Sequence, residues 1–199
     1  VVAINDLAAP ETLLHLLKYD SVHGRLQGSA RLEGDTLHVG PYSIRLTAER
    51  DPAKLPWAEV DIAYECTGLF TQRDAAAKHL ENGSKRVLIS APGKEVDRTV
   101  VYGVNHDELT GEDVIVSNAS CTTNCLAPVA KVLDDTFGIE TGYMTTIHAY
   151  TGDQPTHDSP HRDPYRGRAA ALSMVPTSTG AAAAISEVIP HLKGVLEGS

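Results

Sequence analysis

Apolar positions in the first part of the chain fall into short groups separated by polar turns. Residues 1–6 form a brief apolar run that ends in an acid, Asp6, as expected for a buried strand. Pro10 suits the first turn of a helix, and leucines at positions 13, 14 and 17 give that helix one apolar face. Residues 26–48 then predict short antiparallel strands with a turn at residues 33–35.

From residue 59 onward, the pattern changes to strands that alternate with helices. A helix is predicted at residues 73–82 and is closed by Gly83. The apolar runs predict strands at residues 60–65, 87–90, 100–104 and 114–117. Strands that alternate with helices imply right-handed crossovers, so we expect an α/β fold with a Rossmann-type parallel sheet.

The last third of the chain has a different pattern of apolar and polar residues. The pattern predicts a helix at residues 121–136 that is kinked by Pro128, a strand at 141–150, a polar loop at 151–168 and a helix at 180–192. The parallel strands give way to the first of these helices near Asn118. We therefore expect one domain at residues 1–118 and a second at residues 119–199.

Composition and charge narrow the class of protein. The 199 residues are 42% apolar and 22% charged, as in an ordinary soluble globular protein. No apolar run approaches the roughly 20 residues that cross a bilayer, and no signal peptide opens the chain. The net charge of −9 argues against nucleic acid or a membrane as partner. Three cysteines without a secretory signal indicate reduced thiols and a cytoplasmic setting.

A glycine fingerprint for dinucleotide phosphates is missing. No Gly-x-Gly-x-x-Gly occurs, although the chain begins on what reads as the second strand of a dinucleotide fold. The acid that ends this strand normally lies roughly 20 residues after the fingerprint. We therefore expect the natural protein to have a further strand, turn and helix before Val1.

Cys121 lies where a strand turns into a helix, and that position favours chemistry at sulfur. The positive end of the helix dipole and nearby backbone N–H groups stabilise a thiolate, which is the reactive form. The same N–H groups can hold a developing oxyanion. Two alternatives remain at this point: Cys121, Cys125 and Cys66 are small buried apolar residues, or Cys121 and Cys125 bind zinc. No second pair with ligand spacing accompanies them, so we expect no metal site.

His148 stands apart from the other eight histidines by its context. It ends the strand that follows the cysteine helix, and it opens the polar loop. Histidine is the most common general base in enzymes, and a base beside the thiol would activate it. His157 and His161 lie within the loop and are expected to be solvated.

At these residues the chain resembles the glyceraldehyde-3-phosphate dehydrogenases, the phosphorylating and NAD-dependent family. Residues 117–128, SNASCTTNCLAP, are similar almost letter for letter to the active-site signature of that family. The similarity extends in order over the whole chain. It includes ECTG at 65–68, ISAP at 89–92, YGVNH at 102–106, TIHAYT at 146–151 and PTSTGAA at 176–182.

The resemblance implies a fold, a reaction and a partner. It implies an incomplete NAD-binding domain at residues 1–118 and the first part of an α+β catalytic domain at residues 119–199. The Cys121 thiolate would attack the aldehyde of glyceraldehyde 3-phosphate, with His148 as the base. Oxidation would leave a thioester, from which inorganic phosphate would release 1,3-bisphosphoglycerate. The loop at 151–168 resembles a segment that packs between subunits, which implies a homotetramer.

The resemblance also assigns binding residues. Those that match positions for substrate and phosphate are Ser120, Thr122, Thr151, Arg166, Thr179 and Gly180. Asp6 matches the acid that binds the adenosine ribose and would repel a 2′-phosphate, which favours NAD over NADP. Arg50 and Ser90 match further positions on the cofactor side. One departure is Gly167, where many relatives carry alanine.

Two alternative functions are considered beside this resemblance. Erythrose-4-phosphate dehydrogenase shares the cysteine and histidine, but the runs after Pro176 and after His148 look like the glyceraldehyde phosphate type. A non-catalytic binding protein on the same fold would have no need of a thiol paired with a base. Because segments of the family's pattern are missing at both ends, we expect these 199 residues alone to be inactive and to bind NAD weakly.

Overall fold

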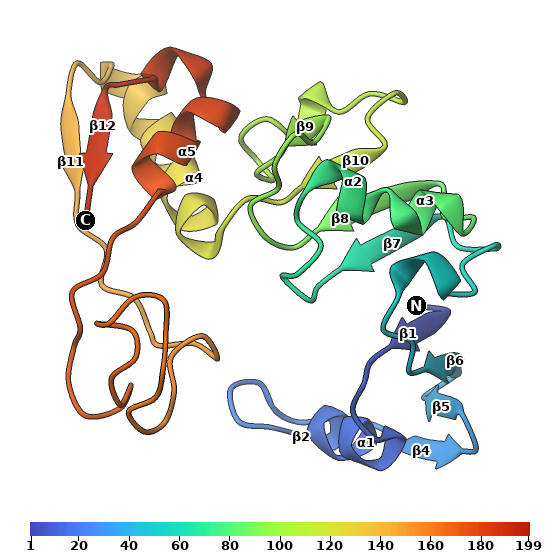
Figure 1. The fold of residues 1–199 in the computed structure, drawn as a ribbon. Helices are drawn as coiled ribbons and strands as arrows, with labels where there is room; N and C mark the ends of the chain where they lie inside the picture. Colours follow the sequence, from blue (N-terminus) through green and yellow to red (C-terminus); the bar gives the residue numbers. More distant parts are fainter. The chain divides into compact units, whose positions relative to one another are not determined.

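The computed structural model describes residues 1–199, and these form two compact units, Val1–Leu88 and Ile89–Ser199 (Figure 1). Both units contain strands and helices, with parallel strand pairs in each. This mixed α/β architecture confirms the expected fold class. None of the helices has both the length and the apolar character needed to cross a membrane.

The first unit begins with a four-stranded sheet in the order β1-β6-β5-β4. Its strands are β1 (Ala3–Asn5), β4 (Ala30–Glu33), β5 (Thr36–Val39) and β6 (Tyr42–Thr47). Strand β1 runs parallel to β6, whereas β4, β5 and β6 are antiparallel, as the sequence predicts for residues 26–48. Helix α1 (Pro10–Lys18) begins at the predicted proline, and its Leu13 and Leu14 pack on Leu37, Ile44 and Leu46 of this sheet. A small hairpin follows α1, with β2 (Tyr19–Asp20) paired to β3 (Gly24–Arg25).

The rest of the first unit contains β7 (Ile62–Glu65) and β8 (Arg86–Ile89), whose last residue opens the second unit. The helix predicted at 73–82 is divided into α2 (Arg73–Ala76) and α3 (Lys78–Glu81). A short 3-10 turn, η1, covers Pro52–Lys54. Gly83 ends α3 with φ of 114°, and a Cβ atom there would lie 2.6 Å from the Cα of Ala58. A side chain therefore has no room at this close approach, which explains the glycine.

A buried polar chain links β7 to α3 inside the first unit. The indole Nε1 of Trp57 donates to Nδ1 of His79 at 3.2 Å, and Nε2 of His79 lies 3.0 Å from Oε2 of Glu65. The side chains of His79 and Glu65 are only 6% and 3% exposed. Because Nδ1 of His79 accepts from Trp57, its Nε2 carries the proton that is donated to Glu65. All three polar side chains are thus satisfied in the core.

The second unit begins with a parallel pair, β9 (Arg98–Thr99) and β10 (Ile115–Ser117), and a 3-10 turn, η2 (His106–Glu108), lies between them. The strand predicted at residues 100–104 is wrong. The backbone turns there because the side chain of Asn105 accepts from the N–H of Val101 at 2.9 Å, and Val104 donates to the carbonyl of Val101. Val101 is apolar because it is buried in the core of this unit and not because it belongs to a sheet.

Two helices form the core of the second unit. Helix α4 (Cys121–Phe137) continues through Pro128 and packs beside α5 (Ala181–Val188), which is followed by a 3-10 turn, η3 (Pro190–Leu192) (Figure 1). Their buried side chains include Ala127, Ala130 and Ile185. The helix predicted at 180–192 is therefore shorter, because Pro190 cannot continue the hydrogen-bond ladder.

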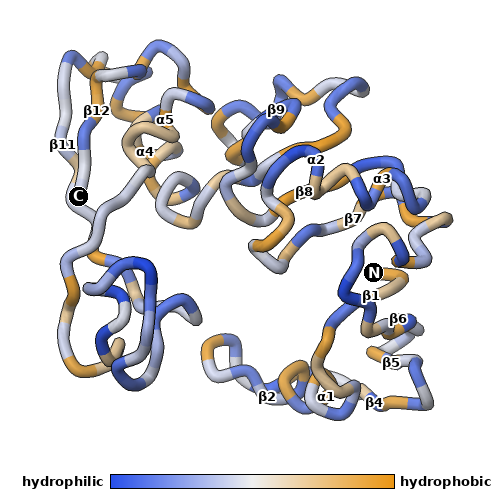
Figure 2. Tube along the Cα trace, in the orientation of Figure 1, coloured by the Kyte–Doolittle hydropathy of each residue, from blue (hydrophilic) through white to orange (hydrophobic).

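A two-stranded parallel sheet, β11 (Gly142–Met144) with β12 (Leu196–Gly198), completes the second unit. The strand predicted at 141–150 is too long, since it ends at Met144 and only the N–H of Thr146 still bonds to the carbonyl of Ser199. No helix or strand interrupts residues 151–168, as predicted for a polar loop. Figure 2 shows this loop in largely hydrophilic colours.

Candidate active site

Cys121 is the first residue of helix α4, and Ser120 is its N-cap. The hydroxyl of Ser120 accepts a hydrogen bond from the backbone N–H of Thr123 at 3.0 Å, which is the usual way to satisfy a free donor at a helix start. It also lies 2.7 Å from the hydroxyl of Thr123. This cap places the thiol at the positive end of the helix, as the sequence predicts.

The turn before Cys121 has an unusual backbone. Ala119 adopts φ of +57°, a left-handed conformation that costs a residue with a Cβ roughly 1–2 kcal/mol. The hydroxyl of Ser117, fully buried at the end of β10, accepts from the N–H of Ala119 at 3.0 Å. The same hydroxyl donates to the carbonyl of Ala91 at 2.8 Å and accepts from the N–H of Gly93 at 3.0 Å. These three hydrogen bonds of the Ser117 hydroxyl hold the turn on the side that faces the core.

Asn124 ties the other side of this turn to the helix. Its side-chain amide donates to the carbonyl of Asn118 at 2.7 Å and to the carbonyl of Ser120 at 2.9 Å. Both neighbours are acceptors, so the amide nitrogen faces them. Neither the left-handed Ala119 nor this amide was recognised from the sequence, because both depend on the backbone path and not on residue type.

The thiol of Cys121 meets the imidazole of His148. Sγ lies 3.1 Å from Nε2, although the two residues are 27 positions apart. Nδ1 of His148 lies 2.6 Å from the carbonyl oxygen of Ala149, which can only accept. Nδ1 therefore carries a proton, and Nε2 is left free to take the proton of the thiol. The geometry is that of a nucleophile with its general base.

The electrostatics favour an ion pair at these two residues. The hydrogen bond from His148, together with the backbone N–H of Thr122, lowers the pKa of the Cys121 thiol below its ordinary value. The carbonyl of Ala149 and then the Cys121 sulfur raise the pKa of His148. Transfer of the proton from sulfur to Nε2 gives a thiolate next to an imidazolium, and each stabilises the other.

The three cysteines are all exposed, so the reading of them as small buried apolar residues is wrong. Cys125 follows Cys121 by one helical turn, and it has no imidazole within hydrogen-bonding distance. Cys66 lies in the first unit, directly after β7. No group of three or more metal-ligating side chains occurs in the structure. Cys121 is thus distinguished by its neighbours and not by its exposure.

Arg166 is held by two carboxylates. Its Nη1 is 3.0 Å from Oδ2 of Asp153, its Nε is 3.6 Å from Oδ2 of Asp163, and Nη2 reaches the carbonyl of Ser178 at 3.5 Å. The positive charge of Arg166 opposes protonation of His148. Arg166 therefore contacts the segment that precedes α5.

The other residues predicted to bind substrate and phosphate also lie in the second unit. Thr122 follows Cys121, and the hydroxyl of Thr151 accepts from the N–H of Asp153 at 3.4 Å. The hydroxyl of Thr179 accepts from the N–H of Ala181 at 3.2 Å, and Gly180 precedes α5. No contact joins Thr179 or Gly180 to Cys121.

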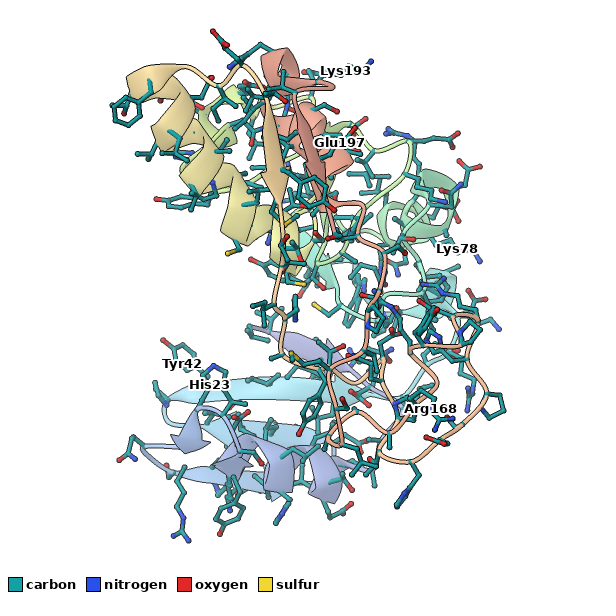
Figure 3. The ribbon with its side chains drawn as sticks, turned by 90° about the vertical axis from the view of Figure 1, so that its left-hand side faces the viewer. His23, Tyr42, Lys78, Arg168, Lys193 and Glu197 are labelled. Carbon is teal, nitrogen blue, oxygen red and sulfur yellow. The ribbon has the colours of Figure 1, made fainter.

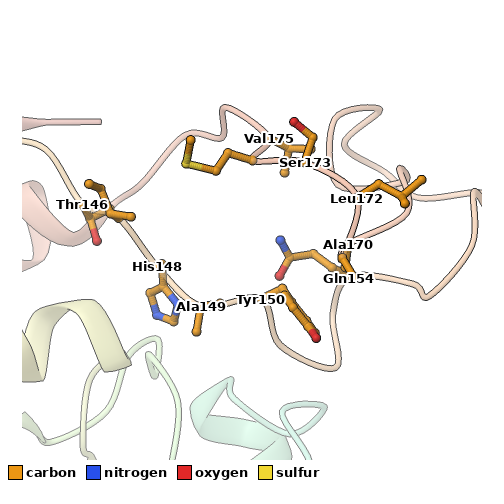
Figure 4. A pocket seen from close by; sticks show the side chains of 12 residues that line it. Thr146, His148, Ala149, Tyr150, Gln154, Ala170, Leu172, Ser173 and Val175 are labelled. Carbon is orange, nitrogen blue, oxygen red and sulfur yellow. Dashed lines mark hydrogen bonds between the residues drawn. The ribbon is translucent and has the colours of Figure 1, made fainter.

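Residues 146–150 and 170–175 line an open hollow of about 380 Å³ in this unit. Figure 4 shows the imidazole of His148 on one wall, with Tyr150 and Gln154 further along and Leu172 and Val175 on the facing segment. The hollow gives His148 one side that is open to solvent.

Packing of the loop explains Gly167, where relatives were expected to carry alanine. A Cβ atom at this position would lie 2.7 Å from the carbonyl oxygen of Ser159.

His161, expected to be solvated, instead packs inside the loop with 14% of its side chain exposed and contacts Asp153 at 3.3 Å. Arg168 extends from the loop (Figure 3) and pairs with Asp158 at 3.1 Å. The loop is therefore cross-linked by ion pairs.

The residues expected on the cofactor side are all exposed. In the first unit, Asp6 and Arg50 follow the carboxyl ends of the parallel strands β1 and β6. One carboxylate oxygen of Asp6 accepts the N–H of Ala8 at 2.8 Å. An exposed carboxylate at the end of a parallel strand fits the paired hydroxyls of a ribose. Ser90 lies in the second unit, directly after β8.

Two family models match the chain. Residues 1–73 match the model described as glyceraldehyde 3-phosphate dehydrogenase, NAD binding domain, and residues 120–199 match the model of the C-terminal domain of the same enzyme.

Similar curated proteins agree with these models. The glyceraldehyde-3-phosphate dehydrogenase of Xanthobacter flavus is 64% identical over 201 residues, and that of Cereibacter sphaeroides is 63% identical over 198 residues. Glyceraldehyde-3-phosphate dehydrogenase 1 of Bacillus subtilis is 57% identical over 202 residues. Each alignment covers 100% of this chain, and the chain spans about 60% of the length of each relative. The chain belongs to the glyceraldehyde-3-phosphate dehydrogenase family.

Proposed function

We propose that the protein containing this chain is an NAD-dependent, phosphorylating glyceraldehyde-3-phosphate dehydrogenase of glycolysis. The observation that carries this proposal is the distance of 3.1 Å between Sγ of Cys121 and Nε2 of His148. A thiolate next to an imidazolium at a helix N-terminus can attack an aldehyde and can later hold an acyl group.

The reaction begins with attack of the Cys121 thiolate on the aldehyde carbon of glyceraldehyde 3-phosphate. A carbon–sulfur bond forms while the carbonyl oxygen takes the proton that His148 holds on Nε2, which gives a hemithioacetal. His148 then accepts this proton again as the hemithioacetal is oxidised to a thioester. NAD, when bound, takes up the hydride. Inorganic phosphate attacks the thioester, which releases 1,3-bisphosphoglycerate and returns Cys121 as the thiolate.

In this proposal, the phosphate of the substrate and inorganic phosphate are bound by hydroxyl groups, by one guanidinium and by the N-terminus of a helix. The residues concerned are Ser120, Thr122, Thr151, Arg166, Thr179 and Gly180. Arg166 supports this role because its charge acts on His148 and because it contacts the carbonyl of Ser178, directly before Thr179. A planar guanidinium binds phosphate oxygens in a bidentate manner.

NAD is the cofactor of the domain family that matches residues 1–73. Asp6 binds the adenosine ribose in the proposal, and Arg50 and Ser90 contact the cofactor. We propose that residues 1–118 contribute to the NAD-binding domain and residues 119–199 to the catalytic domain. We further propose a cytoplasmic homotetramer, supported by three free cysteines and by the similarity of the loop at 151–168 to an intersubunit segment.

The decisive experiment measures NADH formation from glyceraldehyde 3-phosphate by the full-length protein, with and without inorganic phosphate. We expect turnover that requires phosphate and that is lost in Cys121→Ser. Faster oxidation of erythrose 4-phosphate would favour the sister activity instead, and absence of turnover with either aldehyde would favour a binding protein. The 199-residue chain alone is expected to be inactive and to bind NAD weakly, which calorimetric titration tests.

A further inference from the structure

The side-chain amide of Asn124 bonds to the two peptides that lead into the nucleophile. The carbonyl of Asn118 belongs to the peptide that enters Ala119, and the carbonyl of Ser120 belongs to the peptide that enters Cys121. The amide donates to both, at 2.7 and 2.9 Å. The backbone N–H of Asn124 also donates to the carbonyl of Ser120 at 2.9 Å. One residue therefore makes three hydrogen bonds to the turn.

The turn needs such a restraint because its backbone is unfavourable. Ala119 has a Cβ atom and adopts φ of +57°, so it would relax toward negative φ if it were free to do so. Ser117 holds only the N–H of Ala119, on the core side of the turn. The carbonyl of Asn118, on the outer side, has its hydrogen bond from Asn124. Loss of this bond removes one of the two hydrogen bonds made by the peptide between residues 118 and 119, the other being the bond to Ser117.

Rotation of that peptide would move the nucleophile. The contact between Sγ and Nε2 is 3.1 Å long, so a displacement of about 1 Å would break it. The groups around the sulfur are His148, the N–H of Thr122 and the hydroxyl of Thr122, and the charge of Arg166 faces His148 from the loop. His148 and Arg166 lie in other segments and do not follow the turn, whereas both groups of Thr122 belong to the residue after Cys121. The orientation of the thiol therefore depends on the turn.

We propose that Asn124 is a positioning residue that clamps the left-handed turn at Ala119 and thereby holds the Cys121 thiolate against His148. The side-chain amide of Asn124 is already bonded to two carbonyls of the turn. It acts through Cys121, so the inference rests on the proposed role of Cys121 as nucleophile. Its role is to favour the ion pair between the Cys121 thiolate and the His148 imidazolium before any substrate is bound.

A role in the stability of α4 alone makes a different prediction. Alanine is a better helix former than asparagine by a few tenths of a kcal/mol in helix interiors. If Asn124 were only a helix residue, Asn124→Ala would leave the thiol unchanged. If Asn124 is the clamp, the same substitution impairs the thiol although the helix itself becomes no weaker.

The test is alkylation of Cys121 by iodoacetamide in the full-length protein, followed by peptide mapping over a range of pH. Asn124→Ala is expected to slow alkylation about threefold at neutral pH, because the thiolate fraction falls while the remaining thiolate is more nucleophilic. The pH profile moves to higher pH. Lys131→Ala is the matched control, since it removes only an exposed pair with Asp135 on the same helix and is expected to change neither result.

A double-mutant cycle with His148→Ala shows whether the clamp acts through the ion pair. We expect Asn124→Ala to slow alkylation no further when His148 is already replaced. An unchanged rate and pH profile in Asn124→Ala, or an equal slowing in both backgrounds, would overturn the inference. If iodoacetamide does not select Cys121 in the unaltered protein, the proposed function itself fails, and that outcome is separate from the behaviour of Asn124→Ala.

Discussion

Replacement of His148 tests the central contact of the site, and its effect on Cys121 can be estimated from the structure. A charge-assisted hydrogen bond contributes about 1.5–3 kcal/mol. Both side chains are exposed, so water screens the pair and the lower end of this range applies. About 1.4 kcal/mol corresponds to a tenfold change in an equilibrium constant. His148→Ala should therefore lower the thiolate fraction of Cys121 at neutral pH about tenfold.

His148→Ala should change the alkylation rate less than it changes the thiolate fraction. The direction of the effect on the rate should also reverse as the pH rises. A thiolate that is more basic is also more nucleophilic, by roughly threefold for a tenfold weaker acid. At neutral pH the two effects combine to a rate about threefold lower than in the unaltered protein. At alkaline pH, where the thiol is ionised in both proteins, His148→Ala should react about threefold faster. The two rate profiles must therefore cross.

The assay is the rate of iodoacetamide labelling of Cys121 across neutral and alkaline pH. His157→Ala is the control, since this histidine is exposed in the same loop. We expect its profile to match that of the unaltered protein. Equal slowing of His148→Ala at every pH would indicate a steric effect and would refute the electrostatic reasoning, as would profiles that coincide.

Three further predictions concern other residues. In the full-length protein, Cys125→Ser should leave most of the oxidation rate, because this thiol lacks an imidazole partner, and a loss as large as for Cys121→Ser would contradict the assignment. Asp6→Ala should relax the preference for NAD over NADP, measured as the ratio of kcat/KM values, because the carboxylate that repels a 2′-phosphate is gone. His79→Ala should lower the free energy of unfolding in urea by about 2 kcal/mol, since Oε2 of the buried Glu65 loses its hydrogen bond while Oε1 still accepts from Thr67, and a loss below about 1 kcal/mol would show that water replaces the imidazole.

The sequence predicted the elements whose signals are local. Pro10 begins α1 as expected, and the turn at residues 33–35 separates β4 from β5. Cys121 begins α4, as predicted from the change of strand to helix at this point of the chain. These features depend on neighbours within a few positions of the chain.

Other features depend on contacts between distant residues and could not be predicted. The apolar run at residues 100–104 has the composition of a strand, yet the side chain of Asn105 turns the backbone there. The approach of His148 to Cys121 spans 27 residues and was expected only through the family resemblance. The pairing of Arg166 with Asp153 crosses a loop without periodicity, so no pattern in the sequence reports it.

The polar chain of Trp57, His79 and Glu65 has a spectroscopic consequence. Trp57 is the single tryptophan of these 199 residues, and it is 7% exposed in the core of the first unit. Its indole emission therefore reports on that unit alone, while the second unit with Cys121 contains no tryptophan. Far-ultraviolet circular dichroism reports on both units, since α4 is the longest helix. Separation of the two signals during denaturation would reveal whether the two units unfold together, without any label being attached to the protein.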